Sequence, residues 1–164
     1  MHKLILILHN YLKLLSAFSA NGIVALKLEY LVKDLETQIN NYLIELSGGR
    51  FQFNFILEGD KLSIKINDNG SLIDITALSA GELARVNAAT LLAIRKLMMA
   101  IADTSINILF LDEITGTLDI DGKEKLISIL QKEPMNTFLV SHDWSHPAIP
   151  SVTVVRDEET KNSR

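Results

Sequence analysis

The chain has 164 residues, of which 48% are hydrophobic and 22% are charged, so it is long enough for one globular domain with a buried core. Its net charge of −4 gives no basic footprint for nucleic acid, and contact with DNA would need a local patch or a partner. The lack of cysteine excludes a disulfide framework and a thiolate zinc site. No apolar stretch approaches the roughly 18 residues of a membrane span, and we expect a soluble cytoplasmic protein without a membrane partner.

Two stripes of apolar residues at alternating spacings of four and three predict helices in the first third of the chain. One stripe runs over residues 4–18 and the other over residues 28–46, with a break at residues 19–22. Such a stripe is typical of a helix packed on another helix, although an amphipathic helix lying on its own domain gives the same pattern. We interpret residues 1–46 as a helical coiled-coil stub, ended by a left-handed glycine cap after Leu46.

Three short segments of alternating apolar and polar residues predict an antiparallel meander with one solvent-facing side. They span residues 51–57, 62–66 and 72–75. The second connection contains Asn69-Gly70, a step that favours a tight hairpin turn.

The second half of the chain reads as a helix followed by a parallel strand–helix–strand unit. From Ser79 onward the pattern is helical, and the apolar face we expect to be buried consists of Leu83, Val86, Thr90, Leu91, Ile94, Leu97, Met98 and Ile101. Residues 106–111 form a nearly unbroken apolar run, as in a parallel strand covered on both faces. A helix over residues 121–132 and a strand over 137–140 complete a right-handed crossover unit, and residues 152–155 are candidates for a last strand.

Polar groups follow both buried strands. Asp112 and Glu113 end the first, and His142 follows the second, so these side chains should emerge at one edge of the sheet, where open α/β sheets bind ligands. A solvated strand end capped by acids is the plainer reading. His142 and His146 also have the four-residue spacing of a helical zinc site, but the pair follows a strand and Pro147 comes next, which argues against it.

Residues 79–82 (Ser-Ala-Gly-Glu) fit a capping box, in which serine and glutamate satisfy the first amides of a helix. That structural role alone explains the motif. The same geometry also makes an anion site, because a helix start exposes backbone N–H groups and the positive end of the helix dipole.

Taken in order, these patterns resemble a known family. Residues 78–82, residues 106–113 running into 116–119 (Gly-Thr-Leu-Asp), and residues 140–143 (Val-Ser-His-Asp) resemble the signature motif, Walker B motif, D-loop and switch histidine of an ABC-type ATPase. The resemblance is to the SMC-like branch, and within it to the ATPase subunit of the double-strand-break repair nuclease complex, of the SbcC type and its phage recombination endonuclease relatives. It covers about residues 18–142. No Gly-x-x-x-x-Gly-Lys-Ser/Thr loop occurs in the sequence.

The resemblance implies an α/β fold, the C-terminal lobe of an ABC-type P-loop NTPase head. Residues 47–156 would form this lobe, with a parallel sheet core, crossover helices and the meander. Residues 157–164 would be a flexible tail.

The resemblance also implies a role for each motif residue. Ser79, Gly81 and Glu82 would meet the γ-phosphate of ATP bound by a second head, and Asp119 would lie at the dimer seam. Ala80 stands where the family usually has glycine.

For hydrolysis, Asp112 would hold Mg²⁺ through water, Glu113 would polarise the attacking water, and His142 would sense the γ-phosphate. Ile114 replaces the usual proline.

The function implied is that of the ATPase component of a DNA double-strand-break or recombination nuclease complex, with ATP and Mg²⁺ as cofactors. Its partners would be a P-loop-bearing N-terminal lobe, a second ATPase head, a metallophosphoesterase-type nuclease subunit and DNA. We expect it in the cytoplasm, or the host-cell cytoplasm for a phage protein, in association with the nucleoid. An SMC-type structural DNA tether and a non-catalytic lobe are the alternatives. Without a P-loop, the chain alone is expected to bind ATP poorly and to hydrolyse none.

Overall fold

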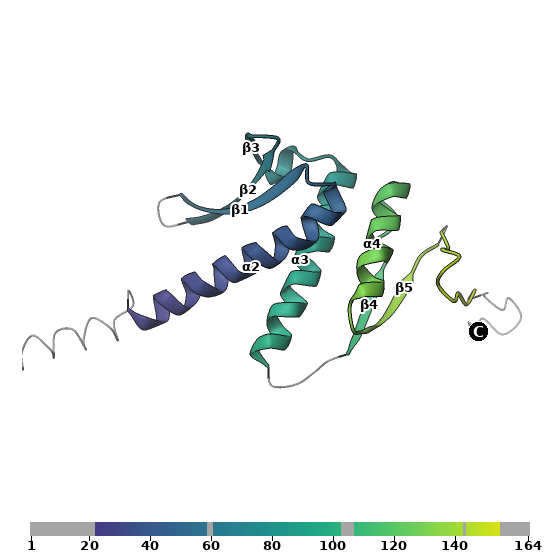
Figure 1. Cartoon of the computed structure of the whole chain (residues 1–164). Coiled ribbons are helices and arrows are strands. Elements are labelled where there is room, and N and C mark those ends of the chain that lie inside the picture. Colours follow the sequence, from purple (N-terminus) through teal and green to yellow (C-terminus); the bar gives the residue numbers. More distant parts are fainter. Residues whose placement is uncertain (1–21, 59–60, 103–106, 143, 155–164) are drawn as a thin grey trace, which may run out of the picture.

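The computed structural model describes residues 22–58, 61–102, 107–142 and 144–154 (Figure 1). The elements in chain order are α2 (Ile23–Ser47), β1 (Phe51–Glu58), β2 (Lys61–Asp68), β3 (Ser71–Asp74), the 3-10 turn η1 (Ile75–Ala77), α3 (Ala80–Ile101), β4 (Ile108–Asp112), α4 (Ile120–Lys132) and β5 (Asn136–Val140). The meander and α3 pack on the second half of α2, and α4 with its two strands lies beyond α3.

Helix α2 confirms the second predicted stripe, and the first stripe lies outside the described residues. Its second half buries Ile39, Leu43 and Leu46, whereas Leu28 and Tyr30 in its first half are exposed where the helix projects from the rest of the chain (Figure 1). Gly48 caps the helix with a φ of 64°, the left-handed conformation expected of a terminal glycine.

Strands β1, β2 and β3 form the predicted antiparallel meander. Asn69 and Gly70 have φ angles of 49° and 94°, so the turn between β2 and β3 takes two left-handed residues, as an Asn-Gly hairpin does. The outer edge of β1 is covered by α2, because the Asn40 side chain accepts from the Phe53 amide at 2.7 Å and donates to the Phe53 carbonyl at 2.8 Å. Polar helix side chains thus protect this strand edge from pairing with another chain.

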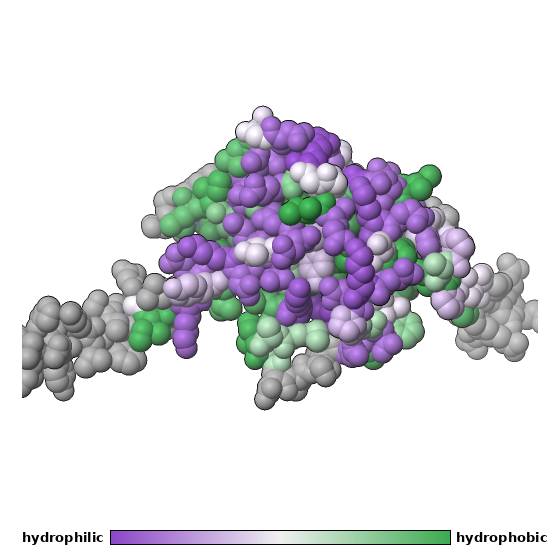
Figure 2. Space-filling view, viewed as in Figure 1, coloured by the Kyte–Doolittle hydropathy of each residue, from purple (hydrophilic) through white to green (hydrophobic). Residues whose placement is uncertain are grey.

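The buried face of α3 differs from the predicted one. The helix packs on α2, and its buried residues, four of them alanines, are Ala84, Val86, Ala88, Ala89, Leu92 and Ala93. The large residues Leu91, Ile94, Met98 and Ile101 are exposed instead, and Figure 2 shows hydrophobic surface at the lower end of α3. Alanines let two helix backbones approach closely, and counting large apolar side chains cannot detect such a contact.

Strands β4 and β5 are parallel and in register from Ile108–Asn136 to Asp112–Val140, with α4 as the crossover, which confirms the predicted strand–helix–strand unit. The expectation that the strand is covered on both faces is wrong for the described residues. Leu111 is buried, but the opposite face exposes Ile108, Phe110, Phe138 and Val140. The rings of Phe110 and Phe138 stack on that open face with their centroids 5.0 Å apart.

The candidate strand at residues 152–155 is not formed over 152–154, and Val155 lies outside the described residues. The preceding segment runs back over the core through Trp144 and Ile149, and Pro147 and Pro150 have no backbone N–H to offer a strand ladder. The predicted tail also lies outside the described residues. No helix within the described ranges is long and apolar enough to cross a membrane.

Candidate functional site

Glu113 and His142 meet at the carboxyl end of the two-stranded sheet. Because Asp112 pairs with Val140 in register, the residues after these two positions leave the sheet side by side. Nε2 of His142 lies 2.5 Å from Oε1 of Glu113. Both side chains are exposed, at 76% for the histidine and 61% for the glutamate. The structure therefore brings together the two residues expected to act on the γ-phosphate and its water.

The backbone at Glu113 is left-handed, with a φ of 52°. A side chain with a Cβ is strained in this conformation by roughly 1–2 kcal/mol. The turn that imposes it is closed by two bonds. The Glu113 amide donates to the Val140 carbonyl at 3.1 Å, and the Gly116 amide donates to the Glu113 carbonyl at 3.0 Å. Strain that a turn maintains at an exposed acid is a common feature of functional sites.

Thr115 is a residue of this site that the sequence did not indicate. Its side chain is 1% exposed, and its hydroxyl donates to the Ser141 hydroxyl at 3.2 Å. This bond ties the turn after β4 to the turn after β5, and so helps to hold Glu113 and His142 beside each other. Threonine in a loop carries no sequence signal for such a bond, because its partner is distant along the chain.

Asp112 ends β4 with an exposed carboxylate, the kind of oxygen ligand that Mg²⁺ takes. No group of three or more potential metal-binding side chains occurs among the residues that the structure describes. Asp112 would therefore give one carboxylate, and the remaining ligands would be water and phosphate oxygens. This fits an ion that keeps much of its hydration and is commonly held through one or two carboxylates.

Ser79 is the N-cap of α3, and the predicted capping box is complete. The Ser79 amide and hydroxyl donate to Oε2 of Glu82 at 2.9 and 2.8 Å, and the Glu82 amide donates back to the Ser79 hydroxyl at 3.4 Å. The bonds from the Ser79 backbone and side chain hold the pKa of Glu82 below its usual value, with a further contribution from Arg50. Ser79 is exposed, so this helix start is open to an incoming group.

Residues 116–119, the segment that resembles a D-loop, lie against this helix start. A Cβ on Gly81 would stand 3.2 Å from the Thr117 carbonyl oxygen, so the two segments are in close contact. Asp119 caps α4 by accepting from the Gly122 amide at 2.8 Å, and it pairs with Arg85 of α3 at 2.6 Å. These contacts lower the pKa of Asp119. Residues 116–119 therefore connect the Glu113 turn with the start of α3, and Arg85 is a contributor that the motifs did not identify.

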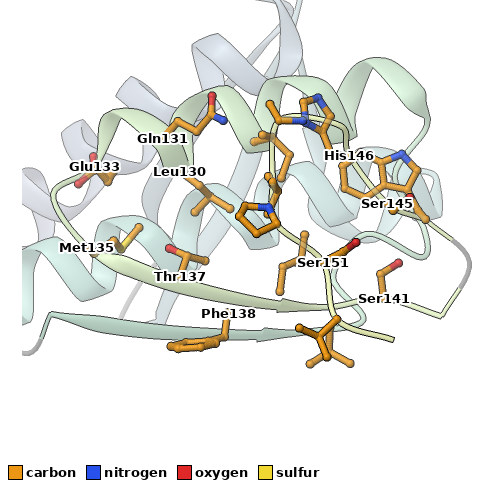
Figure 3. A pocket seen from close by; sticks show the side chains of 18 residues that line it. Leu130, Gln131, Glu133, Met135, Thr137, Phe138, Ser141, Ser145, His146 and Ser151 are labelled. Atoms are coloured by element: carbon orange, nitrogen blue, oxygen red, sulfur yellow. The ribbon is translucent and has the colours of Figure 1, made fainter. Parts of the chain in front are cut away.

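A pocket of about 640 Å³ lies elsewhere, between α4, β5 and the segment after residue 143 (Figure 3). Its wall is largely apolar and includes Leu130, Met135 and Trp144. Glu113 is not part of its lining, so the exposed acid and its histidine partner lie on an open rim and not inside this pocket. His146 lines the pocket and bonds Glu124 at 2.9 Å, so it has a partner other than His142.

Comparison with known proteins supports the expected resemblance. No protein-family model matches the chain. The chain is 40% identical over 139 residues to the probable exonuclease subunit 2 of Escherichia phage T5. The match covers 84% of this chain and 23% of the phage protein, so the chain spans less than a quarter of that relative's length.

Solved structures of SMC ATPase heads share the fold. One, from work on the ATP-driven dimerization and DNA-stimulated activation of SMC ATPases, has a TM-score of 0.65 at 17% identity, over 81% of this chain and 82% of the other. A second, an Smc head bound to the C-terminal winged-helix domain of ScpA, has a TM-score of 0.54 at 19% identity, over 68% and 36% of the two chains. A third, from Pyrococcus furiosus, has a TM-score of 0.51 at 21% identity, over 68% and 29%. The predicted fold and the predicted resemblance are both confirmed.

Proposed function

We propose that the chain is part of the ATPase of a DNA double-strand-break or recombination nuclease complex. The premise is that it has the fold of the carboxy-terminal lobe of an SMC-like ABC-type ATPase head. The observation that carries this proposal is the pairing of Glu113 with His142 at the end of β4, on a strained turn. The similarity to an exonuclease subunit of phage T5 favours a nuclease complex over other assemblies with the same fold.

We assign a task to each polar group at the sheet edge. His142 holds Oε1 of Glu113, which leaves Oε2 to accept a hydrogen bond from a water molecule and to orient it. Asp112 directly precedes Glu113 and would hold a magnesium-bound water. Mg²⁺ with ATP, when bound, would neutralise the charge of the phosphate groups.

The exposed face of the β4–β5 sheet is where we place the P-loop-bearing N-terminal lobe. Phe110 is 71% exposed and Phe138 is 54% exposed, and parallel sheets are normally covered on both faces. A sheet of two strands also leaves an outer edge of each strand for further pairing. The lobe that covers this face would also supply the P-loop contacts to the phosphates.

A second head would meet the exposed start of α3. Ser79 and Gly81 would contact the phosphate of the nucleotide held by that head, with Asp119 at the seam between the two. The related SMC ATPase structure comes from work on ATP-driven dimerization, which is the behaviour that this arrangement requires.

The test is to combine the chain with the P-loop-bearing lobe from the same source and to measure hydrolysis and dimerisation with Mg²⁺-ATP. The chain alone should show no hydrolysis, because it lacks a P-loop. With both lobes present, Glu113→Gln should lower kcat roughly 100-fold or more while dimers still form. Ser79→Arg should abolish the dimer, whereas the control Ser71→Arg, at an exposed serine on β3, should not. Hydrolysis that is unaffected by Glu113→Gln would refute the proposal.

The alternative function is that of an SMC-type DNA tether, and it is favoured by the likeness to Smc heads bound to ScpA. The two functions differ in their partner. Reconstitution with a metallophosphoesterase-type subunit should give ATP-dependent degradation of DNA ends if the nuclease proposal is right. A stable complex with a non-enzymatic bridging chain, without degradation, would support the tether.

A further inference from the structure

Arg50 occupies a junction between the end of α2, the meander and the start of α3. It follows Gly48, the cap of α2, and Gly49, which both have positive φ angles. Its Nε and one terminal nitrogen hold the two oxygens of Asp68 at 2.8 and 2.7 Å. The other terminal nitrogen lies 2.7 Å from Oε1 of Glu82. One guanidinium thus bridges two carboxylates from different elements.

Glu82 is the residue through which Arg50 reaches the start of α3 at residues 78–82, here called the signature loop. Its two oxygens have separate partners, because Oε2 accepts from the amide and hydroxyl of Ser79 while Oε1 faces Arg50. Arg50 therefore fixes the carboxylate that in turn fixes Ser79. The guanidinium group also lies over the Phe51 ring, with 4.5 Å from its central carbon to the ring centroid, which restricts it further.

The charge of Glu82 conflicts with the proposed task of the signature loop. A carboxylate 2.8 Å from the Ser79 hydroxyl would repel an approaching phosphate, and it would offset the positive end of the helix dipole. Arg50 places a positive charge on the side of Glu82 that faces away from Ser79. With Arg50 present, the loop keeps its capping box and the guanidinium, which it shares with Asp68, offsets part of the repulsion.

We propose that Arg50 is a positioning residue for the signature loop. It holds Glu82 in its capping geometry and offsets its charge, so that Ser79 can receive the phosphate of a nucleotide bound by a second head. This inference rests on the proposed function. Arg50 also links the end of α2 to the signature loop, so the binding site for the second head is connected through one side chain to the long helix.

A purely structural role is the competing explanation, since Arg50 could simply fasten the meander to α3. The two explanations differ in the effect of removing the Glu82 charge. Glutamine at position 82 can keep the capping box, because its side-chain oxygen still accepts from Ser79. If the charge of Glu82 must be offset, a double variant that removes the charges of both Arg50 and Glu82 restores dimerisation. If Arg50 is only a structural link, dimerisation is impaired in the single and the double variant alike.

The experiment uses the assembled head, made of the chain and its P-loop-bearing lobe, and measures the Mg²⁺-ATP concentration that gives half-maximal dimerisation, together with kcat at saturation. Arg50→Gln should raise that concentration about 5-fold, at the upper end for a half-exposed ion pair, with kcat unchanged. Adding Glu82→Gln should bring it back to within about 2-fold of the wild type. The control Lys132→Gln breaks a surface ion pair of the same 2.7 Å length between α4 and α2, and should change neither quantity.

A double variant no better than Arg50→Gln, or a fall in kcat without a change in the half-maximal concentration, would overturn the proposal. A second measurement needs no nucleotide, namely the titration of the Glu82 carboxyl by NMR in the whole chain. Arg50→Gln should raise the pKa of Glu82, because one of the causes of its low value is removed. An unchanged titration with normal dimerisation overturns this inference alone, whereas wild-type heads that never dimerise overturn the proposed function and this inference with it.

Discussion

Replacing Glu113 by glycine and by alanine separates the strain of its backbone from the chemistry of its side chain. At ordinary positions alanine is more favourable than glycine, because glycine loses more backbone freedom on folding. At position 113 the φ of 52° reverses this order, since a Cβ is strained there and glycine is not. The strain of roughly 1–2 kcal/mol exceeds the entropic cost of glycine of roughly 0.5–1 kcal/mol. The side chain is 61% exposed, so trimming it removes little packing in either variant.

We therefore expect Glu113→Gly to be more stable than Glu113→Ala by about 1 kcal/mol in urea denaturation, or roughly 2–4 °C in Tm. Both variants should lose hydrolysis in the assembled head. The same pair of substitutions at Asn87, an exposed position inside α3, should give the opposite order, with alanine more stable by about 1 kcal/mol. An alanine variant at position 113 that equals or exceeds the glycine variant in stability would refute the claim that this turn is strained.

Two further substitutions test polar contacts that stabilise the fold. The hydroxyl and amide of Thr76, with Lys65, lower the pKa of Asp74 to about 2 from 3.8. The contribution of the Asp74 carboxylate to stability is therefore present above pH 4 and is lost as the pH falls from 3.8 toward 2. Asp74→Asn should flatten that part of the curve of unfolding free energy against pH. Tyr42 donates to Oε1 of Glu133 at 2.6 Å, and Tyr42→Phe should lower the free energy of unfolding in urea by about 1.5 kcal/mol, because it removes a partner from a mostly buried carboxylate. An unchanged curve in the first case, or an unchanged urea midpoint in the second, would contradict the described contacts.

Local chemistry made part of this structure predictable. The Asn69-Gly70 turn, the glycine cap at Gly48 and the Ser79 capping box each depend on residues within four positions of one another, so the sequence contains everything that determines them. The meeting of Glu113 and His142 was predictable for a different reason. Two parallel strands joined by one helix must end at the same edge, and each residue follows such a strand directly.

Contacts between distant parts of the chain were not predictable in this way. The partners of Arg50 and Arg85 lie 18 to 34 positions away, and an arginine that pairs at that distance has no local pattern. The buried face of α3 was misread because the contact with α2 uses alanines, whose small apolar signal is outweighed by Leu91 and Met98 on the other side. Those larger residues have the pattern of a buried face and lie exposed in the described structure.

The exposed aromatic face of the β4–β5 sheet and the exposed polar residues at its end both favour a partner at the same place on the chain. The stacked Phe110 and Phe138 face solvent on β4 and β5, and the ends of those same strands lead to Glu113 and His142. A partner that covers the aromatic face would therefore lie beside Glu113 and His142. If that partner is the proposed P-loop-bearing lobe, covering the aromatic face would also bring its phosphate ligands to these two residues. Phe110→Ser should then abolish assembly and hydrolysis together.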